Sequence, residues 1–113
     1  FFFESFLLYL YIKIKTYMNN NPITIKIYED AVKEAYPKVK NYIFGEISDS
    51  DYLHIVDIAT SVMLTRDNIL QGGSFVQSIV KNNLEGAFCR ADSVCERAIK
   101  FFIYCNSYIH PKI

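Results

Sequence analysis

The sequence has few of the residue types and charge patterns that most often indicate a function. Among its 113 residues there is no Trp, only three Cys, three Pro and four Gly, and 12 basic residues balance 12 acidic ones. Three cysteines cannot close a disulfide framework. Zero net charge disfavours a nucleic-acid-binding protein, which needs clustered Lys and Arg to neutralise phosphates. What remains is the chain of one domain, in which 51% hydrophobic residues can build one core.

The first seventeen residues are unusually aromatic. Glu4 and Lys13 interrupt their apolar run, so the segment falls short of the ~18 residues of a membrane span. Between positions 10 and 15, apolar and polar side chains alternate, which is the pattern of a half-buried strand. The aromatic residues are Phe1, Phe2, Phe3, Phe6, Tyr9, Tyr11 and Tyr17.

Two interpretations of this segment stay open. Residues with AT-rich codons are abundant in the sequence, and translated non-coding DNA from an AT-rich genome would resemble residues 1–17. In one interpretation the native chain therefore begins at Met18, and residues 18–113 form a single helical domain. In the other, residues 1–17 are a short strand in the core or at a membrane surface.

The spacing of apolar residues predicts strands first and helices afterwards. Ile23–Tyr28 alternates like a strand, whereas spacing of three and four predicts a helix over Glu29–Phe44, interrupted at Pro37. Further helices are expected from about 49 to 65, from 74 to 88, and from 92 to the tail, where Pro111 ends the chain's last helix. The expected fold is thus mainly α (α+β): one or two short N-terminal strands followed by a small bundle of about four helices.

Three residues are expected to cap these helices. Ser48, Ser74 and Asp92 each precede an apolar-periodic segment, and their side-chain oxygens can accept a hydrogen bond from a free backbone N–H group.

Residues 67–102 carry a resemblance. A helix start Gly72-Gly73-Ser74-Phe75-Val76 is followed by an Ala91-Asp92 pair that opens the next helix. This pattern resembles the C-terminal part of small, uncharacterised bacteriophage-type proteins. The resemblance implies a phage or prophage source, and it brings no catalytic residue and no cofactor.

The residues that could support chemistry are poorly spaced for it. Cys89, Cys95 and Cys105 lie 6 and 10 residues apart, whereas structural zinc ligands usually come in pairs two to four apart. We therefore expect reduced, largely buried thiols in a cytoplasmic protein. His54 lies three residues from both Asp51 and Asp57, but the two carboxylates diverge on a helix, which favours a solvated polar face over a metal or catalytic site. No catalytic residue, metal ligand or cofactor is predicted.

A run of acidic residues is the remaining candidate site. It opens the helix expected from 49, and it either complements the helix dipole or binds a basic protein surface. Its members are Glu46, Asp49, Asp51 and Asp57.

The sequence therefore predicts a non-enzymatic protein-interaction protein of phage or prophage type, acting in the cytoplasm of a bacterium or an infected host. It would self-associate or bind a host or phage protein. One alternative is a helix-turn-helix-like nucleic-acid-binding protein whose recognition helix begins at Ser74 or at Ser93. Another is a small membrane-associated protein that uses residues 1–17.

Overall fold

The described part of the chain is helical throughout. The computed structural model describes residues 6–10 and 22–111, and within these ranges there are helices and turns but no strands. The expectation of N-terminal strands is therefore wrong. Besides a short helix at residues 6–10, the elements are α2 (Pro22–Ala35), 3-10 turns at Tyr36–Lys38 and Lys40–Tyr42, α3 (Asp49–Arg66), α4 (Ser74–Val80), α5 (Leu84–Arg90), α6 (Ser93–Arg97) and α7 (Ile99–Tyr108).

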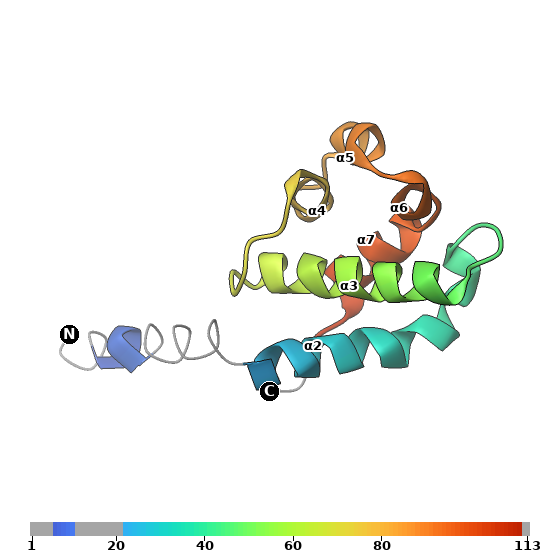
Figure 1. Cartoon of the computed structure of the whole chain (residues 1–113). Helices are drawn as coiled ribbons and strands as arrows, with labels where there is room; N and C mark the ends of the chain where they lie inside the picture. Colours follow the sequence, from blue (N-terminus) through green and yellow to red (C-terminus); the bar gives the residue numbers. More distant parts are fainter. Residues whose placement is uncertain (1–5, 11–21, 112–113) are drawn as a thin grey trace.

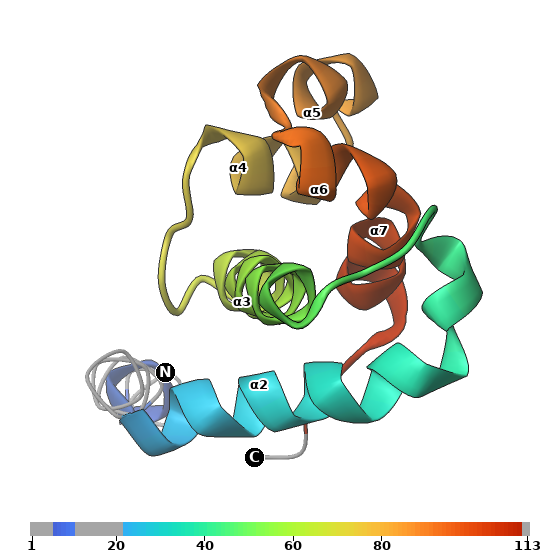
Figure 2. The ribbon, with the colours of Figure 1, turned by 45° about the vertical axis from the view of Figure 1, so that its right-hand side comes forward.

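The helices are arranged around α3. Helix α2 lies on one side of α3, α7 lies beside it, and α4, α5 and α6 lie on the side opposite α2 (Figures 1 and 2). Helix α3 contacts α2, α4, α6 and α7, whereas α5 packs mainly on α4. None of the described helices combines the length and the hydropathy needed to cross a membrane.

Helix α2 occupies the segment that was predicted to begin as a strand. Its buried residues are Thr24, Tyr28, Val32 and Ala35, which follow one another at intervals of four, four and three. Ile23, by contrast, is 66% exposed. The alternation of isoleucines is thus incidental. The helical period was hidden because Thr and Tyr supply its buried positions and count as polar in a hydropathy pattern.

The other expected strand, at residues 10–15, lies outside the described residues except for Leu10. Leu10 closes the short helix at residues 6–10, whose side chains are all exposed. The hypothesis of a native start at Met18 also concerns residues outside the described ranges.

Two of the expected helices are divided in the structure, and the break expected at Pro37 is present. Pro37 lies in the 3-10 turn that follows α2, in agreement with the expected interruption. The helix expected over 74–88 is in fact two helices, because Asn82 adopts a left-handed backbone (φ 59°) and Asn83 starts α5 by accepting a hydrogen bond from Gly86 N at 3.0 Å. The last expected helix is likewise divided, at Ala98, into α6 and α7.

Two of the three predicted helix caps, Ser48 and Asp92, are confirmed. Ser48 Oγ accepts from Asp51 N at 3.1 Å, and the Asp51 carboxylate accepts in return from Ser48 N, which completes a capping box. Asp92 Oδ1 accepts from Cys95 N at 2.7 Å. The expectation for Ser74 is wrong: Gly73 is the N-cap residue, and Ser74 is already the first residue of α4.

A chain of aromatic rings crosses the core. Phe75 of α4 meets Phe102 edge to face at 5.7 Å between ring centroids, Phe102 adjoins Phe101, and Phe101 meets Tyr36 at 5.9 Å. Tyr36 in turn meets Tyr52 of α3 at 4.7 Å. Phe101 and Phe102 are fully buried. These rings connect α7 to α3, α4 and the turn after α2, and edge-to-face pairs add to the stability that burial provides.

Arg66, at the end of α3, fastens the C-terminal end of α7. Its Nη1 donates to three carbonyl oxygens, those of Cys105, Asn106 and Ile109, at 3.1, 3.0 and 2.7 Å. Its Nε and Nη2 donate to the two carboxylate oxygens of Asp67, and Tyr28 of α2 donates to the same carboxylate at 2.7 Å. One guanidinium therefore links the ends of α3 and α7 and, through Asp67, α2.

This network should make the free energy of unfolding decrease at acid pH. Burial alone raises the pKa of the Asp67 carboxyl, but hydrogen bonds from Arg66 and Tyr28 outweigh burial and hold that pKa below its ordinary value. The stabilisation is therefore fully present above the unfolded-state pKa of about 3.9, and it is lost as the pH falls through the lower folded-state value. Urea unfolding between pH 7 and pH 2.5 should show stability decreasing below about pH 4. In Asp67→Asn this decrease should be smaller; an equal decrease in both proteins would assign it to other carboxylates.

Candidate functional site

An apolar groove lies between α5 and α7. Its floor and walls contain Phe44, Leu84, Phe88 and Ile103, whose side chains are 66%, 53%, 49% and 38% exposed. An exposed cluster of large apolar side chains in a chain of this size is typical of an interaction surface.

The groove arises from the way α5 is attached. Helix α5 packs mainly on α4, and Gly86 and Ala87 are its buried residues. Leu84 and Phe88 consequently point away from α4 and toward α7, where they form one wall of the groove. Phe44 is held at the other side of the groove, where its backbone N–H donates to the Arg97 carbonyl at 3.1 Å.

The rim of the groove carries charged side chains of both signs. Glu96 and Lys100 both line the groove, four residues apart, and neither forms an ion pair with another described residue. The Lys100 ammonium lies over the Tyr42 ring, 4.3 Å from its centroid. Arg97, the third charged residue here, is occupied: it donates to the Phe44 and Glu46 carbonyls and lies 3.5 Å from Asp51.

The acidic residues proposed from the sequence do not act as one group. Asp51 is engaged in the capping box and with Arg97, and its side chain is 25% exposed. Glu46 meets Arg97 through its backbone carbonyl. Asp49 and Asp57 are exposed on α3, without an ion pair among the described residues. Among the described residues, the carboxylates of Glu46, Asp49 and Asp57 are therefore exposed and outside ion pairs, whereas that of Asp51 is engaged.

The basic residues of the helix-turn-helix alternative are also partly engaged. Arg97 is occupied as above, and Arg90 Nη1 donates to Ser78 Oγ at 3.0 Å. The two proposed reading helices, which start at Ser74 and Ser93, have seven and five residues. Lys81 and Lys100 are exposed, and neither forms an ion pair with a residue that the structure describes.

His54 meets two residues that are distant in sequence. Its Nε2 lies 2.8 Å from Asp92 Oδ2 and 3.6 Å from Cys95 Sγ. The neighbours expected from the sequence, Asp51 and Asp57, are not its partners. Histidine, aspartate and cysteine each offer one atom to this cluster, and all three atoms lie within 4.8 Å of one another.

The cluster is poorly arranged for nucleophilic catalysis. In a Cys-His-Asp triad the two ring nitrogens face different partners, whereas here Nε2 faces both. Burial, followed by the neighbouring Asp92, raises the pKa of the Cys95 thiol to about 12. A reactive cysteine needs a lowered pKa and access to solvent, but Cys95 is 2% exposed.

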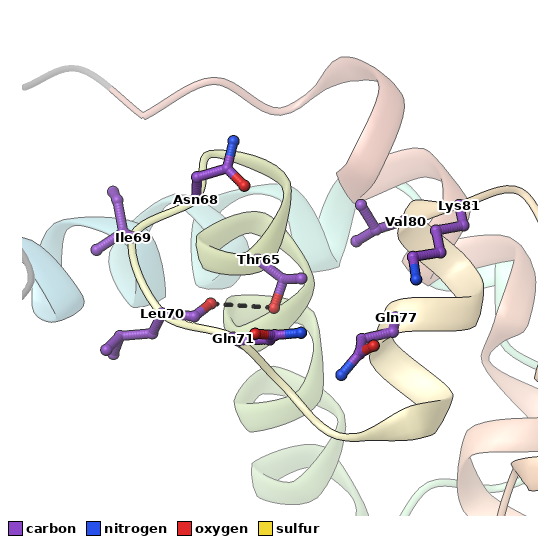
Figure 3. Close-up of a pocket in the computed structure, with 8 residues that line it drawn as sticks. All are labelled: Thr65, Asn68, Ile69, Leu70, Gln71, Gln77, Val80 and Lys81. Carbon is purple, nitrogen blue, oxygen red and sulfur yellow. Dashed lines mark hydrogen bonds between the residues drawn. The ribbon is translucent and has the colours of Figure 1, made fainter.

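A second concavity, between the end of α3 and α4, is polar. Asn68, Gln71, Gln77 and Lys81 contribute to its lining, and its volume is about 400 Å³ (Figure 3). Thr65 Oγ1 donates to the Leu70 carbonyl at 3.1 Å (Figure 3). The same oxygen accepts from Gly72 N at 2.8 Å, so this hydroxyl holds the loop in place. The lining contains no carboxylate, imidazole or thiol; its hydroxyl, that of Thr65, is engaged with the loop, and its one charged group is the Lys81 ammonium.

Sequence reasoning missed both the groove and the cluster. The single helix expected over 74–88 would carry Leu84 and Phe88 on its apolar face, whereas the structure breaks it at Asn82 and leaves both side chains exposed. A signal for part of the cluster exists in the spacing of Asp92 and Cys95, which lie three residues apart at the start of a helix. Comparison of the chain with protein-family models, curated proteins and solved structures finds no match.

Proposed function

We propose that this protein works by protein–protein association, and that its groove binds the groove of a second copy. The observation that carries the proposal is the exposed apolar cluster of Phe44, Leu84, Phe88 and Ile103, bordered by Glu96 and Lys100, neither of which forms an ion pair within the described part of the chain. The proposal assigns no catalytic role, and the bacteriophage-type source expected from residues 67–102 stays a prediction.

The charges on the rim favour a second copy as the occupant. In a two-fold symmetric interface, if residue i of one copy contacts residue j of the other, the reverse contact also forms. When the grooves face each other, Glu96 of each copy can therefore lie against Lys100 of the other, which gives two intermolecular ion pairs. Zero net charge adds to this, since two copies do not repel each other at long range.

The contact is small, so the association is expected to be weak. Each copy contributes four large apolar side chains that are already about half buried, and burial of such side chains must offset about 4–15 kcal/mol of lost freedom. We expect a dissociation constant in the micromolar range, which corresponds to about −8 kcal/mol at 1 μM. Sedimentation equilibrium over a wide range of protein concentrations measures it.

Charge reversal on the rim tests the arrangement. Glu96→Lys and Lys100→Glu should each weaken self-association about tenfold, because like charges then meet across the interface. The double variant, in which the two charges are exchanged, should restore it. An equimolar mixture of the two single variants should form a heterodimer, since all of its cross-interface pairs are opposite.

A matched pair of leucines supplies the apolar control. Leu84→Glu places a charge in the groove and should weaken dimerisation at least tenfold, since truncation at a buried contact costs more than ~1 kcal/mol. Leu53→Glu changes an exposed leucine on α3 (63% exposed, against 53% for Leu84) and should leave the dimer intact. A chain that stays monomeric at every concentration, or a dimer that Leu53→Glu disrupts as strongly as Leu84→Glu, would overturn the proposal.

A further inference from the structure

From the geometry around His54 we infer that His54, Asp92 and Cys95 bind a zinc ion. This inference is independent of the groove and of self-association. It rests on three donor atoms of the types that zinc prefers, brought together from α3 and from the start of α6.

The spacing of the donor atoms suits a tetrahedral ion. With Zn–N and Zn–S bonds of about 2.0–2.1 and 2.3 Å, the N···S edge of a tetrahedron is roughly 3.5 Å. The observed distance between His54 Nε2 and Cys95 Sγ is 3.6 Å. The corresponding N···O edge is roughly 3.3 Å, and the observed 2.8 Å between His54 Nε2 and Asp92 Oδ2 is that of a hydrogen bond. An ion in place of the proton would need this edge to lengthen by about 0.5 Å.

Without an ion, hydrogen bonds to the Asp92 carboxylate hold the cluster together. Asp92 accepts from His54 Nε2 at 2.8 Å and from the Cys95 thiol, and an Nε2 that donates to Asp92 cannot also accept from Cys95. One ion at the point where nitrogen, oxygen and sulfur converge would satisfy all three. The zinc–sulfur bond forms as the thiol proton passes to solvent.

The protein also orients the ligands. Asp92 Oδ1 accepts from Cys95 N at 2.7 Å, which leaves Oδ2 directed at the cluster. A carboxylate ligand fixed by a second hydrogen bond is typical of zinc sites. The side chains of His54 and Asp92 are 40% and 55% exposed, so an ion has access from solvent and keeps a fourth position for water.

Titration with Co²⁺ and then Zn²⁺ tests the site. The full chain carrying Cys89→Ser is used, because Cys89 is the exposed thiol and its removal leaves Cys95 and Cys105, both buried, as the thiols of the chain. We expect one Co²⁺ per chain, with a sulfur-to-cobalt charge-transfer band and the intense visible bands of a tetrahedral ion, and displacement of Co²⁺ by one equivalent of Zn²⁺. Thermal unfolding should shift upward with the concentration of free Zn²⁺.

Three variants identify the ligands. Cys95→Ser should abolish the charge-transfer band, and His54→Gln should lower the affinity at least tenfold. Asp92→Asn should do the same while the helix cap is retained, because asparagine caps helices as well as aspartate does. Circular dichroism of the metal-free variants checks that they fold. Absence of tetrahedral bands in the Cys89→Ser protein, or bands that persist in Cys95→Ser, would overturn the inference.

Discussion

Replacing Phe102 by alanine should lower the free energy of unfolding by about 3–5 kcal/mol. Phe102 is fully buried in α7, and its ring contacts the rings of Phe75 and Phe101. Removal of the ring loses the transfer free energy of its carbon atoms, and it leaves a cavity that the surrounding helices fill only in part. Urea unfolding followed by circular dichroism measures the change.

The next residue along the helix is the control for this substitution. Ile103 belongs to the same turn of α7 but is 38% exposed, so Ile103→Ala should cost no more than about 1 kcal/mol in the monomer. Low protein concentration keeps self-association from contributing. A loss below about 1 kcal/mol for Phe102→Ala would mean that the aromatic chain is not the centre of the core.

The second large effect is expected at Arg66. Arg66→Ala should destabilise the protein by about 3 kcal/mol, since it removes five hydrogen bonds and leaves the Asp67 carboxylate and three carbonyl oxygens without that donor. The Arg66 side chain is only 15% exposed, so water replaces these bonds incompletely. Thermal and urea unfolding at pH 7 measure the loss.

Two further variants separate the contributions of Arg66. Arg66→Lys keeps the charge but cannot serve the carboxylate and the carbonyls together, and it should fall between wild type and Arg66→Ala. Arg90→Ala removes an exposed arginine with one side-chain hydrogen bond and should cost no more than about 1 kcal/mol. Equal losses for Arg66→Ala and Arg90→Ala would show that the fastening of α7 contributes little.

What the sequence could predict depended on local signals. The central helix was expected from about 49 to 65 and extends from Asp49 to Arg66, because Ser48 and the acidic first turn mark its start without help from the rest of the fold. The interruption at Pro37 was predictable for the same reason, since proline removes a backbone donor wherever it stands.

The predictions from the sequence failed where contacts between residues distant in sequence determine the structure. Thr24 and Tyr28 are on the buried face of α2. Tyr28 can be buried because its hydroxyl donates to Asp67, 39 residues away. The cluster around His54 joins residues separated by 38 and 41 positions, a proximity that no spacing rule reveals. The groove depended on the backbone of Asn82, since a continuous helix would have directed Leu84 and Phe88 inward.

The central position of α3 also has a consequence for motion. Because α2, α4, α6 and α7 all rest on α3, none of them can detach without uncovering core that the others share, so these helices should open together. Helix α5 is different, because it packs mainly on α4. Its amide protons should exchange with solvent through brief local openings long before those of α3. Because α5 forms one wall of the groove, that wall should be able to adjust its position when the groove is bound.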